Sequence, residues 1–420
     1  LFGNLYLTGT ERLVFGLRPT DQTDPTGGRQ FSGYRHQSID GGLAGGDFVD
    51  QFNLDWDTVS HLFFEGELGE LFPNMDIDDR HGLDLGLSVG RQPLNFQEGL
   101  LINDFVDAVG VTQNNLRPGN VVNLRFTGLY GWNQINRNTP ADLSIIRNLE
   151  GEGAHMVGGF TEIDWRSTTA AFDVIYIRGG DFIARPGVIA TADRVTAGDG
   201  IYAGVSLVGR PGAGAFNMSL RALGSFPVGD RTPGGGVILG DLSGTSLSYS
   251  DPASRGGLVF SEVSWTPHHT YNFFYANSFA AVDDYRAAAL DPTVPGPLAR
   301  AGILFAGPGL GNVPGVLSST ASDVVGGAFG HQMFFKDKRQ QLLLEAGGRY
   351  STRDCVDGFL NCDPHAVAGM ARYQMAWGRR GVLRFDAFAA RDQLRGLIRD
   401  ADGDDVAIRV GGRAEIIVKF

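Results

Sequence analysis

The 420-residue sequence lacks long hydrophobic runs. Its hydrophobic residues make up 42% of the chain but lie in short patches, and none reaches the roughly 18 to 20 residues that a membrane-spanning helix needs. The chain begins Leu1-Phe2-Gly3, without Met and without a secretion signal, as expected of a mature, processed protein. The lack of long hydrophobic runs excludes a transmembrane helix.

Cysteine and positive charge are both scarce. The net charge of −12 argues against nucleic acid as a partner, because phosphate binding needs a basic surface. Cys355 and Cys362 lie in a polar segment and are too few for a typical metal site. A small loop closed by a disulfide fits them better, and it predicts an oxidising compartment such as the periplasm or the cell surface.

Signatures of catalysis are absent as well. The sequence contains no GxSxG, no HExxH and no phosphate-binding glycine loop. His268 and His269 resemble a metal pair but fall in a tight turn, and the other histidines lack a matching serine. We therefore predict that the protein is not an enzyme and needs no cofactor.

One segment indicates a weak calcium site. Asp400, Asp402 and Asp404 alternate around a glycine, as the carboxylates of a calcium-binding turn do. Gly411 stands where a complete EF-hand loop needs its last glutamate. A solvated acidic loop is the favoured alternative.

Glycine and phenylalanine, in contrast, are abundant, with 61 and 28 residues. They occur in a recurring unit of about ten residues with alternating polarity, bounded by turn residues, which is typical of a transmembrane β-strand. Residues 122–130, 271–279 and 342–350 show the alternation clearly. One side of such a strand meets lipid while the other meets water.

Connections between these units alternate between short and long, as tight periplasmic turns and long extracellular loops do in outer-membrane barrels. The sequence predicts about sixteen strands, an even number that places both termini in the periplasm, and eighteen remains open. The fold class is thus an all-β, transmembrane, antiparallel up-and-down β-barrel, forming a single domain over residues 1–420. The predicted strands are 5–17, 50–70, 83–92, 105–113, 121–130, 155–165, 169–178, 200–209, 215–224, 257–266, 270–280, 323–335, 340–350, 365–376, 382–391 and 406–420.

The last predicted strand, 406–420, has an apolar face and a charged face and stops at Phe420. A strand ending in a terminal Phe resembles the signal that outer-membrane barrels carry for their insertion machinery. The alternative is a soluble β-sandwich with a chance terminal Phe. Such a protein would not need regular loop asymmetry.

Alternation also sorts the charged residues of the strands onto the face that would line a pore. The predicted basic wall consists of Arg12, Arg349, Arg372, Arg384, Arg409 and Arg413, with Glu345, Asp386 and Glu415 among them. The predicted acidic wall consists of Asp55, Glu65, Glu67, Asp84, Glu162, Asp164 and Asp173, with Arg125 as the main exception. Opposed walls would create a transverse field that sorts ions. Alternatively, arginines and carboxylates neutralise each other on neighbouring strands.

Two connecting segments are too apolar for solvated loops. Residues 281–322 would fold into the barrel mouth as a constriction or plug, or would form an external cap. Residues 93–104 would also line the mouth.

Residues 87–94 (LSVGRQPL) followed by 105–111 (FVDAVGV) resemble the alginate-export family of barrels. That family has a GRQ-containing strand followed by a strand with Asp-Gly, where this sequence has Ala108 after the Asp. The resemblance implies eighteen strands and an arginine-rich conduit for an anionic polysaccharide. The predicted acidic wall does not fit such a conduit.

Three functional hypotheses follow. The first is a pore in the outer membrane of a Gram-negative-type bacterium for passive diffusion of small polar or charged solutes. The second is an exporter of an anionic polysaccharide, and the third is a non-transporting barrel that anchors a surface layer or another complex. Expected partners are outer-membrane lipid and lipopolysaccharide, together with the solute or polymer, a second copy of the chain, or a surface-layer partner.

Overall fold

The computed structural model describes residues 2–7, 10–17, 22–23, 29–30, 59–72, 84–133, 135–136, 154–179, 181–182, 195–196, 199–210, 216–228, 238–240, 246–248, 255–267, 270–290, 296–300, 320–352, 365–378, 380–393 and 406–418. The chain forms two compact units. Unit 1 consists of Leu1–Val205, Leu223–Arg255 and Arg286–Pro295, and unit 2 of Ser206–Ala222, Gly256–Tyr285 and Gly296–Phe420. Each unit is described by itself.

The long strands are antiparallel and pair with their neighbours along the chain. Unit 1 contains β1 (Phe2–Tyr6), β2 (Arg12–Leu17), β5 (Val59–Glu67), β6 (Leu85–Phe96), β7 (Ile102–Leu116), β8 (Asn123–Asn133), β9 (His155–Asp164) and β10 (Thr168–Arg178). Unit 2 contains β17 (Gly256–Trp265), β18 (Phe273–Tyr285), β20 (Ala321–Phe335), β21 (Gln340–Ser351), β22 (Ala366–Trp377), β23 (Gly381–Gln393) and β24 (Val406–Val418). β13 (Asp199–Gly209) and β14 (Phe216–Val228) have residues in both units.

Short elements complete the described chain. They are β3 (Gln22–Thr23), β4 (Arg29–Gln30), α1 (Leu68–Leu71), η2 (Gln97–Gly99), β11 (Asp181–Phe182), β12 (Val195–Thr196), β15 (Ile238–Gly240), β16 (Ser246–Ser248), β19 (Ala289–Leu290) and η3 (Pro297–Arg300). Within the described residues, no helix is long and apolar enough to cross a membrane.

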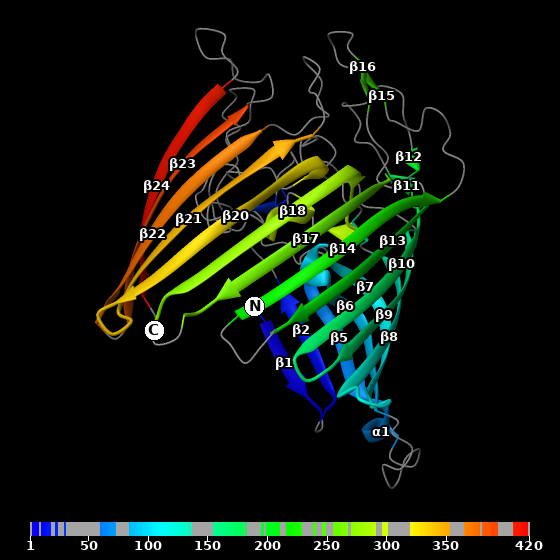
Figure 1. Cartoon of the computed structure of the whole chain (residues 1–420). Helices are drawn as coiled ribbons and strands as arrows, with labels where there is room; N and C mark the ends of the chain where they lie inside the picture. The colour runs from blue at the N-terminus through cyan, green and yellow to red at the C-terminus, as the bar shows by residue number, and fades with distance from the viewer. Residues whose placement is uncertain are drawn as a thin grey trace. The chain divides into compact units, whose positions relative to one another are not determined.

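The predicted all-β, antiparallel, up-and-down fold is confirmed. In unit 1 the pairing runs from β1 through β2 and β5 to β10 without a crossover, and in unit 2 it runs from β17 through β18 and β20 to β24. Figure 1 shows the strands of unit 2 running side by side. The main sheet contains 18 of the described strands, and one of them is the two-residue β19, which pairs in parallel with β7.

The predicted strand 5–17 is wrong, because the chain reverses within it. β1 and β2 form a hairpin in which Tyr6 lies opposite Arg12, and the amide of Leu7 donates to the carbonyl of Glu11 at 2.9 Å. The polar sequence Thr8-Gly9-Thr10 supplies turn-forming residues at this position. This hairpin and the two-residue strand β19 account for the difference between sixteen and eighteen.

The predicted strand 50–70 is also too long. β5 ends at Glu67, and Leu68–Leu71 form one helical turn, α1, in which the amide of Phe72 donates to the carbonyl of Leu68 at 2.9 Å. Leu and Glu favour helix over strand, so this short LGEL sequence leaves the sheet. Residues 51–58 lie outside the described part of the chain.

The strands carry an outer face of exposed apolar side chains and an inner face of buried or half-buried ones. On β24 the residues Val410, Ile416 and Val418 are exposed, while Arg413 and Glu415 between them are half-buried. Exposed aliphatic residues in regular alternation would aggregate in water, and lipid is the environment that accepts them. The outer face is therefore the lipid-facing surface.

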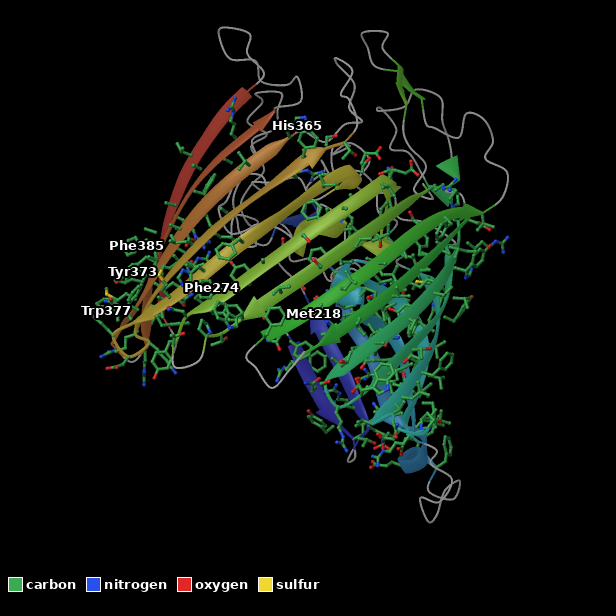
Figure 2. The ribbon with its side chains drawn as sticks, viewed as in Figure 1. Met218, Phe274, His365, Tyr373, Trp377 and Phe385 are labelled. Atoms are coloured by element: carbon green, nitrogen blue, oxygen red, sulfur yellow. The ribbon has the colours of Figure 1, made fainter. Side chains whose placement is uncertain are left out.

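Aromatic residues border this outer face at both ends of the strands. Figure 2 shows Trp377 and Phe385 at the short-turn end of β22 and β23, and His365 at the long-loop end. His365 stacks on Tyr350 with ring centroids 4.2 Å apart. Twelve residues of a tilted strand span about 25 Å across a bilayer, the height of the apolar band in outer-membrane barrels. The strands thus match a membrane in length.

Candidate functional site

In unit 2 the inner face is a network of ion pairs between neighbouring strands. Asp386 on β23 lies directly opposite Arg372 on β22 and Arg413 on β24. Its carboxylate accepts from Arg372 Nε at 2.7 Å and from Arg413 Nη2 at 2.7 Å. Two residues away from Asp386 along β23, Arg384 lies opposite Glu415 on β24, and its Nη1 donates to Glu415 Oε2 at 2.9 Å. Cross-strand register places each carboxylate beside the guanidinium that neutralises it.

Unit 1 shows the same arrangement. Arg12 on β2 lies opposite Glu65 on β5 and pairs with its carboxylate. Arg125 on β8 lies opposite Glu162 on β9 and pairs with it. The side chains of Arg125 and Glu162 are 43% and 37% exposed, so both groups reach water. These charges lie on the face opposite the lipid-facing side chains.

These pairs favour neutralisation on neighbouring strands over two uniform walls. Arg12 was predicted for the basic wall and Glu65 for the acidic wall, yet the two form one ion pair. Arg372, Arg384 and Arg413 each contact a carboxylate within unit 2. The opposed-wall field stays a prediction.

The remaining acidic residues of the prediction have neutral partners or line a pocket. Asp84 accepts from Asn115 Nδ2 at 2.6 Å, and Asp164 accepts from Thr169 Oγ1 at 2.6 Å. Asp173 is buried and accepts from Gln97 Nε2 at 2.7 Å. Glu67 lines the pocket described next. Arg349, predicted for the basic wall, is buried and donates to the carbonyl of Thr320 at 3.3 Å.

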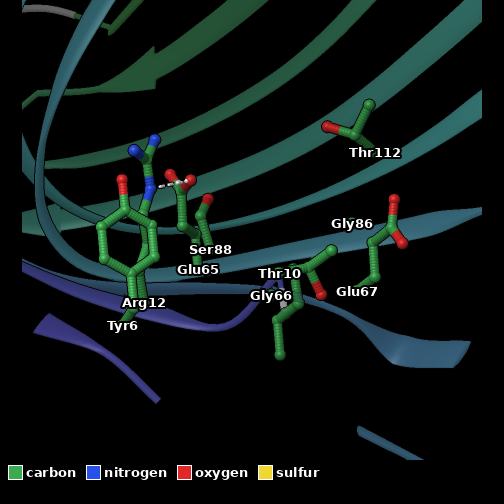
Figure 3. A pocket seen from close by; sticks show the side chains of 10 residues that line it. Tyr6, Thr10, Arg12, Glu65, Gly66, Glu67, Gly86, Ser88 and Thr112 are labelled. Atoms are coloured by element: carbon green, nitrogen blue, oxygen red, sulfur yellow. Dashed lines mark hydrogen bonds and ion pairs between the residues drawn. The ribbon is translucent and has the colours of Figure 1, made fainter. Parts of the chain in front are cut away.

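A cavity of about 450 Å³ opens among β1, β2, β5, β6 and β7 (Figure 3). The Arg12–Glu65 pair and Glu67 line it, so it gathers three of the predicted pore residues. Its other polar lining consists of hydroxyl groups, from Tyr6, Thr10, Ser88 and Thr112. A space lined by an ion pair and hydroxyls is suited to water and polar solutes.

The tip of the β6–β7 hairpin, residues 92–106, folds over the inner face of unit 1. Phe96 stacks on Phe160 of β9 at 3.5 Å between ring centroids, and Gln97 bonds Asp173 of β10. The hairpin tip also lies close to β13, because a Cβ added at Gly204 would be only 3.1 Å from Gln97 Cγ. β9, β10 and β13 are separated from β7 by β8, so the tip crosses the inner face of the curved sheet.

A buried ion pair lies at the base of this hairpin tip. Arg91 Nε and Nη2 donate to the two carboxylate oxygens of Asp107 at 2.8 and 3.1 Å, and Asn133 Nδ2 donates to the same carboxylate at 2.8 Å. Arg91 belongs to the GRQ sequence and Asp107 to the following strand, the two features of the family resemblance. Their role in this chain is therefore to join β6 to β7 at the point where the tip leaves the lipid-facing wall.

A second segment, residues 286–290, packs on the hairpin tip. The amide of Ala288 donates to the carbonyl of Leu101 at 2.9 Å, and β19 pairs in parallel with Ile102 and Asn103 of β7. All five residues of the segment are buried. The hairpin tip and the 286–290 segment together are called the inner layer below.

The positions of residues 286–290 agree with the prediction that loop 281–322 folds inward, and not with the alternative of an external cap. The same holds for 93–104, which forms most of the hairpin tip. Residues 291–295 and 301–319 lie outside the described part of the chain. Sequence reasoning missed Gln97 and its bond to Asp173, because the two residues are 76 positions apart. The apolar loop sequences were the only feature that indicated inward packing.

Several predicted residues lie outside what the structure describes. They are Asp55, Cys355, Cys362, Asp400, Asp402, Asp404 and Phe420, and the side chain of Arg409. The disulfide, the calcium turn and the terminal insertion signal therefore stay predictions. Among the described side chains, no group of three or more His, Cys, Asp or Glu is arranged to hold a metal ion.

No family model and no curated protein matches the sequence. Among solved structures, the chain is similar to OccK5 (OpdH) of Pseudomonas aeruginosa, with 9% identity and a TM-score of 0.42 over 80% of this chain and 78% of that chain. It is similar to OccK3 (OpdO) of the same organism, with 10% identity and a TM-score of 0.44 over 79% and 75%. BamA of Haemophilus ducreyi lacking POTRA domains 1–3 gives 10% and 0.39 over 85% and 68%.

Likeness of this degree carries no argument about function, so the class of the protein follows from its own strands. Successive antiparallel neighbours, an apolar outer face bordered by aromatic residues and a charged inner face define a membrane-spanning β-barrel of the outer-membrane type. The resemblance to the alginate-export family stays a prediction.

Proposed function

We propose that the protein is an outer-membrane pore for the passive diffusion of small polar or charged solutes, without catalysis. The observation that carries the proposal is the solvent exposure of the inner-face charges. The side chains of Arg125, Glu162 and Glu415 are all more than one third exposed. Ionised groups on a membrane-spanning strand need water, and they lie on the face turned away from lipid.

The number of strands supports the same conclusion. A closed barrel of eight strands is filled by its own side chains, whereas sixteen to eighteen strands leave an aqueous channel. The inner face includes ion pairs and hydroxyl groups, which suit polar solutes of either sign. Of the predicted basic residues, Arg12, Arg372, Arg384 and Arg413 each pair with a carboxylate within their own unit, which disfavours a dedicated conduit for an anionic polymer.

The inner layer sets an upper limit on solute size in this proposal. It brings Phe96, Gln97 and Leu101 to the inner face of strands that are not their neighbours in the sheet. Side chains inserted there narrow the channel, and the polar contact between Gln97 and Asp173 holds the hairpin tip in place.

Liposome swelling with a series of neutral sugars and amino acids tests the proposal. Folded wild-type protein is expected to admit the smallest solutes fastest, with a sharp decline as size increases. The matched variant F96A/Q97A, which removes the stacking of Phe96 on Phe160 and the hydrogen bond from Gln97 to Asp173, is expected to admit larger solutes. Liposomes that contain the folded protein but do not swell in any solute would refute the pore and favour an anchoring role.

A further inference from the structure

Two outward-facing pairs of tyrosine and histidine occur at the long-loop end of the strands, one in each unit. In unit 1, the hydroxyl of Tyr130 on β8 bonds His155 Nδ1 on β9 at 2.9 Å, with the two rings stacked at 6.0 Å. In unit 2, Tyr350 on β21 stacks on His365 beside β22. Each pair borders a long connection, 134–154 or 352–365. The same arrangement thus occurs on two separate hairpins.

In both pairs the histidine Nδ1 is engaged and its Nε2 is left to donate. His365 Nδ1 lies 3.0 Å from the backbone amide of Ser351, which can only donate, so in the neutral ring the proton resides on Nε2. The Tyr130 hydroxyl fixes the His155 ring in the same way when it donates to Nδ1. Each pair therefore presents one N–H donor toward the outside.

An exposed arginine accompanies each pair on the outer face. Arg178 on β10 lies directly opposite His155, and Arg391 on β23 lies opposite Val367, two residues from His365 on the same face. Directly opposed and diagonal residues on one face are close enough for their side chains to converge on one ligand. In unit 1, the nearby carboxylate of Asp199 is engaged by the Tyr176 hydroxyl and by the amide of Gly179.

These clusters lie at the edge of the apolar band, where lipid headgroups begin. Toward the middle of the membrane, each is followed on the outer face by apolar residues such as Val157 and Val367, which are 55% and 57% exposed. A guanidinium and an imidazole N–H at this depth match a phosphate in charge and in hydrogen bonding. This position favours a lipid headgroup over a free solute as the ligand, because the clusters border the lipid-facing surface and not the channel.

We infer that Tyr130–His155–Arg178 and Tyr350–His365–Arg391 are two binding sites for the phosphate of an anionic lipid headgroup in the leaflet at the long-loop end. The inference rests on the proposed membrane-spanning pore but concerns its outer surface. Each arginine and histidine donates to phosphate oxygens, while the tyrosine positions the imidazole ring.

Native mass spectrometry of the detergent-purified chain, titrated with diphosphoryl lipid A, tests the inference. The variant R178Q/R391Q is expected to bind about tenfold more weakly at each site, since each loses a charge-assisted hydrogen bond. The variant H155F/H365F keeps a stacked ring, lacks the donor and is also expected to bind more weakly. The control R166Q/R380Q also removes two positive charges, but from exposed turn positions, and it is expected to bind as wild type does.

Three results would overturn the inference. They are equal binding by wild type and R178Q/R391Q, an equal loss in the control, and complete displacement of the lipid by millimolar inorganic phosphate, which would assign the sites to free anion. Monophosphoryl lipid A with the same acyl chains is expected to bind more weakly than the diphosphoryl form. Conductance separates this inference from the proposed function, because the substituted residues face outward and the variants should conduct as wild type does.

Discussion

Neutralising Asp386 tests whether the ion pairs of the inner face hold the strands together as well as lining the channel. The side chain of Asp386 is 1% exposed and accepts four hydrogen bonds from Arg372 and Arg413, at 2.7 to 3.1 Å. The substitution D386N removes the carboxylate between two guanidinium groups that face each other across β23, and Arg413 keeps the longer 3.5 Å contact with Glu415. Removing one partner of a buried ion pair typically costs about 3 to 5 kcal/mol, and we expect a loss near 3 kcal/mol because Arg413 is partly exposed.

Glu415 offers a matched control on the next strand. It also carries one negative charge on the inner face and pairs with Arg384 at 2.9 Å and with Arg413 at 3.5 Å, but its side chain is 36% exposed. An exposed pair contributes little, so E415Q should cost less than about 1 kcal/mol. The two variants change the charge of the channel equally and differ in burial.

Urea unfolding of the protein in lipid vesicles measures the free energy of unfolding, and reversal potentials in a KCl gradient measure ion preference. We expect both variants to shift selectivity toward anions to a similar degree, and only D386N to lose substantial stability. If D386N is no less stable than E415Q, the buried network does not hold β22, β23 and β24 together. If neither substitution moves the reversal potential, these residues do not line a conducting path.

Three further predictions concern the outer face, a strand contact and the inner layer. V410R places a charge on the lipid-facing side of β24 and should destabilise the protein by about 2 to 4 kcal/mol, while V410I should change little in the same urea assay. G90A should impair folding, because Gly90 has φ +124° and a Cβ there would lie 2.3 Å from the carbonyl oxygen of Leu62 on β5; normal yield of folded protein would count against this contact. A288P removes the amide that bonds Leu101 and should raise single-channel conductance, and an unchanged conductance would show that the inner layer does not limit the current.

Alternating polarity predicted the strands and their faces because each side chain of a membrane-spanning strand must meet either lipid or water. The same rule separates Val410 and Ile416 from Arg413 and Glu415 on β24. It failed at residues 5–17, where the two arms of the β1–β2 hairpin are separated by only a few residues. There, the turn-forming sequence Thr8-Gly9-Thr10 was the feature that indicated a hairpin.

The ion pairs depend on register, which alternation alone does not contain. For β22 and β23 the short turn supplies it: with Trp377 opposite Gly381, Arg372 must face Asp386, so this pair was predictable from the turn. No such signal exists for Asp386 and Arg413, because a long connection joins β23 to β24. Assigning residues to walls by face, without register, therefore separated Arg12 from the Glu65 that neutralises it.

The inner layer was predictable only in outline. Its apolar sequence argues against a solvated loop, because apolar side chains are more stable when they are packed away from water. The partners of that surface are distant in sequence: β19 pairs with β7 across nearly 190 residues, in parallel and over two residues only. Pairing this short and this distant leaves no periodic pattern in the sequence.

In the proposed function, water and small solutes cross the membrane along the charged inner face. Single-channel recording of the purified, folded protein in a planar bilayer tests it most directly. We expect discrete current steps that scale linearly with voltage, and a shift of the reversal potential toward anions for both D386N and E415Q. A folded protein that inserts into the bilayer and carries no current would contradict it.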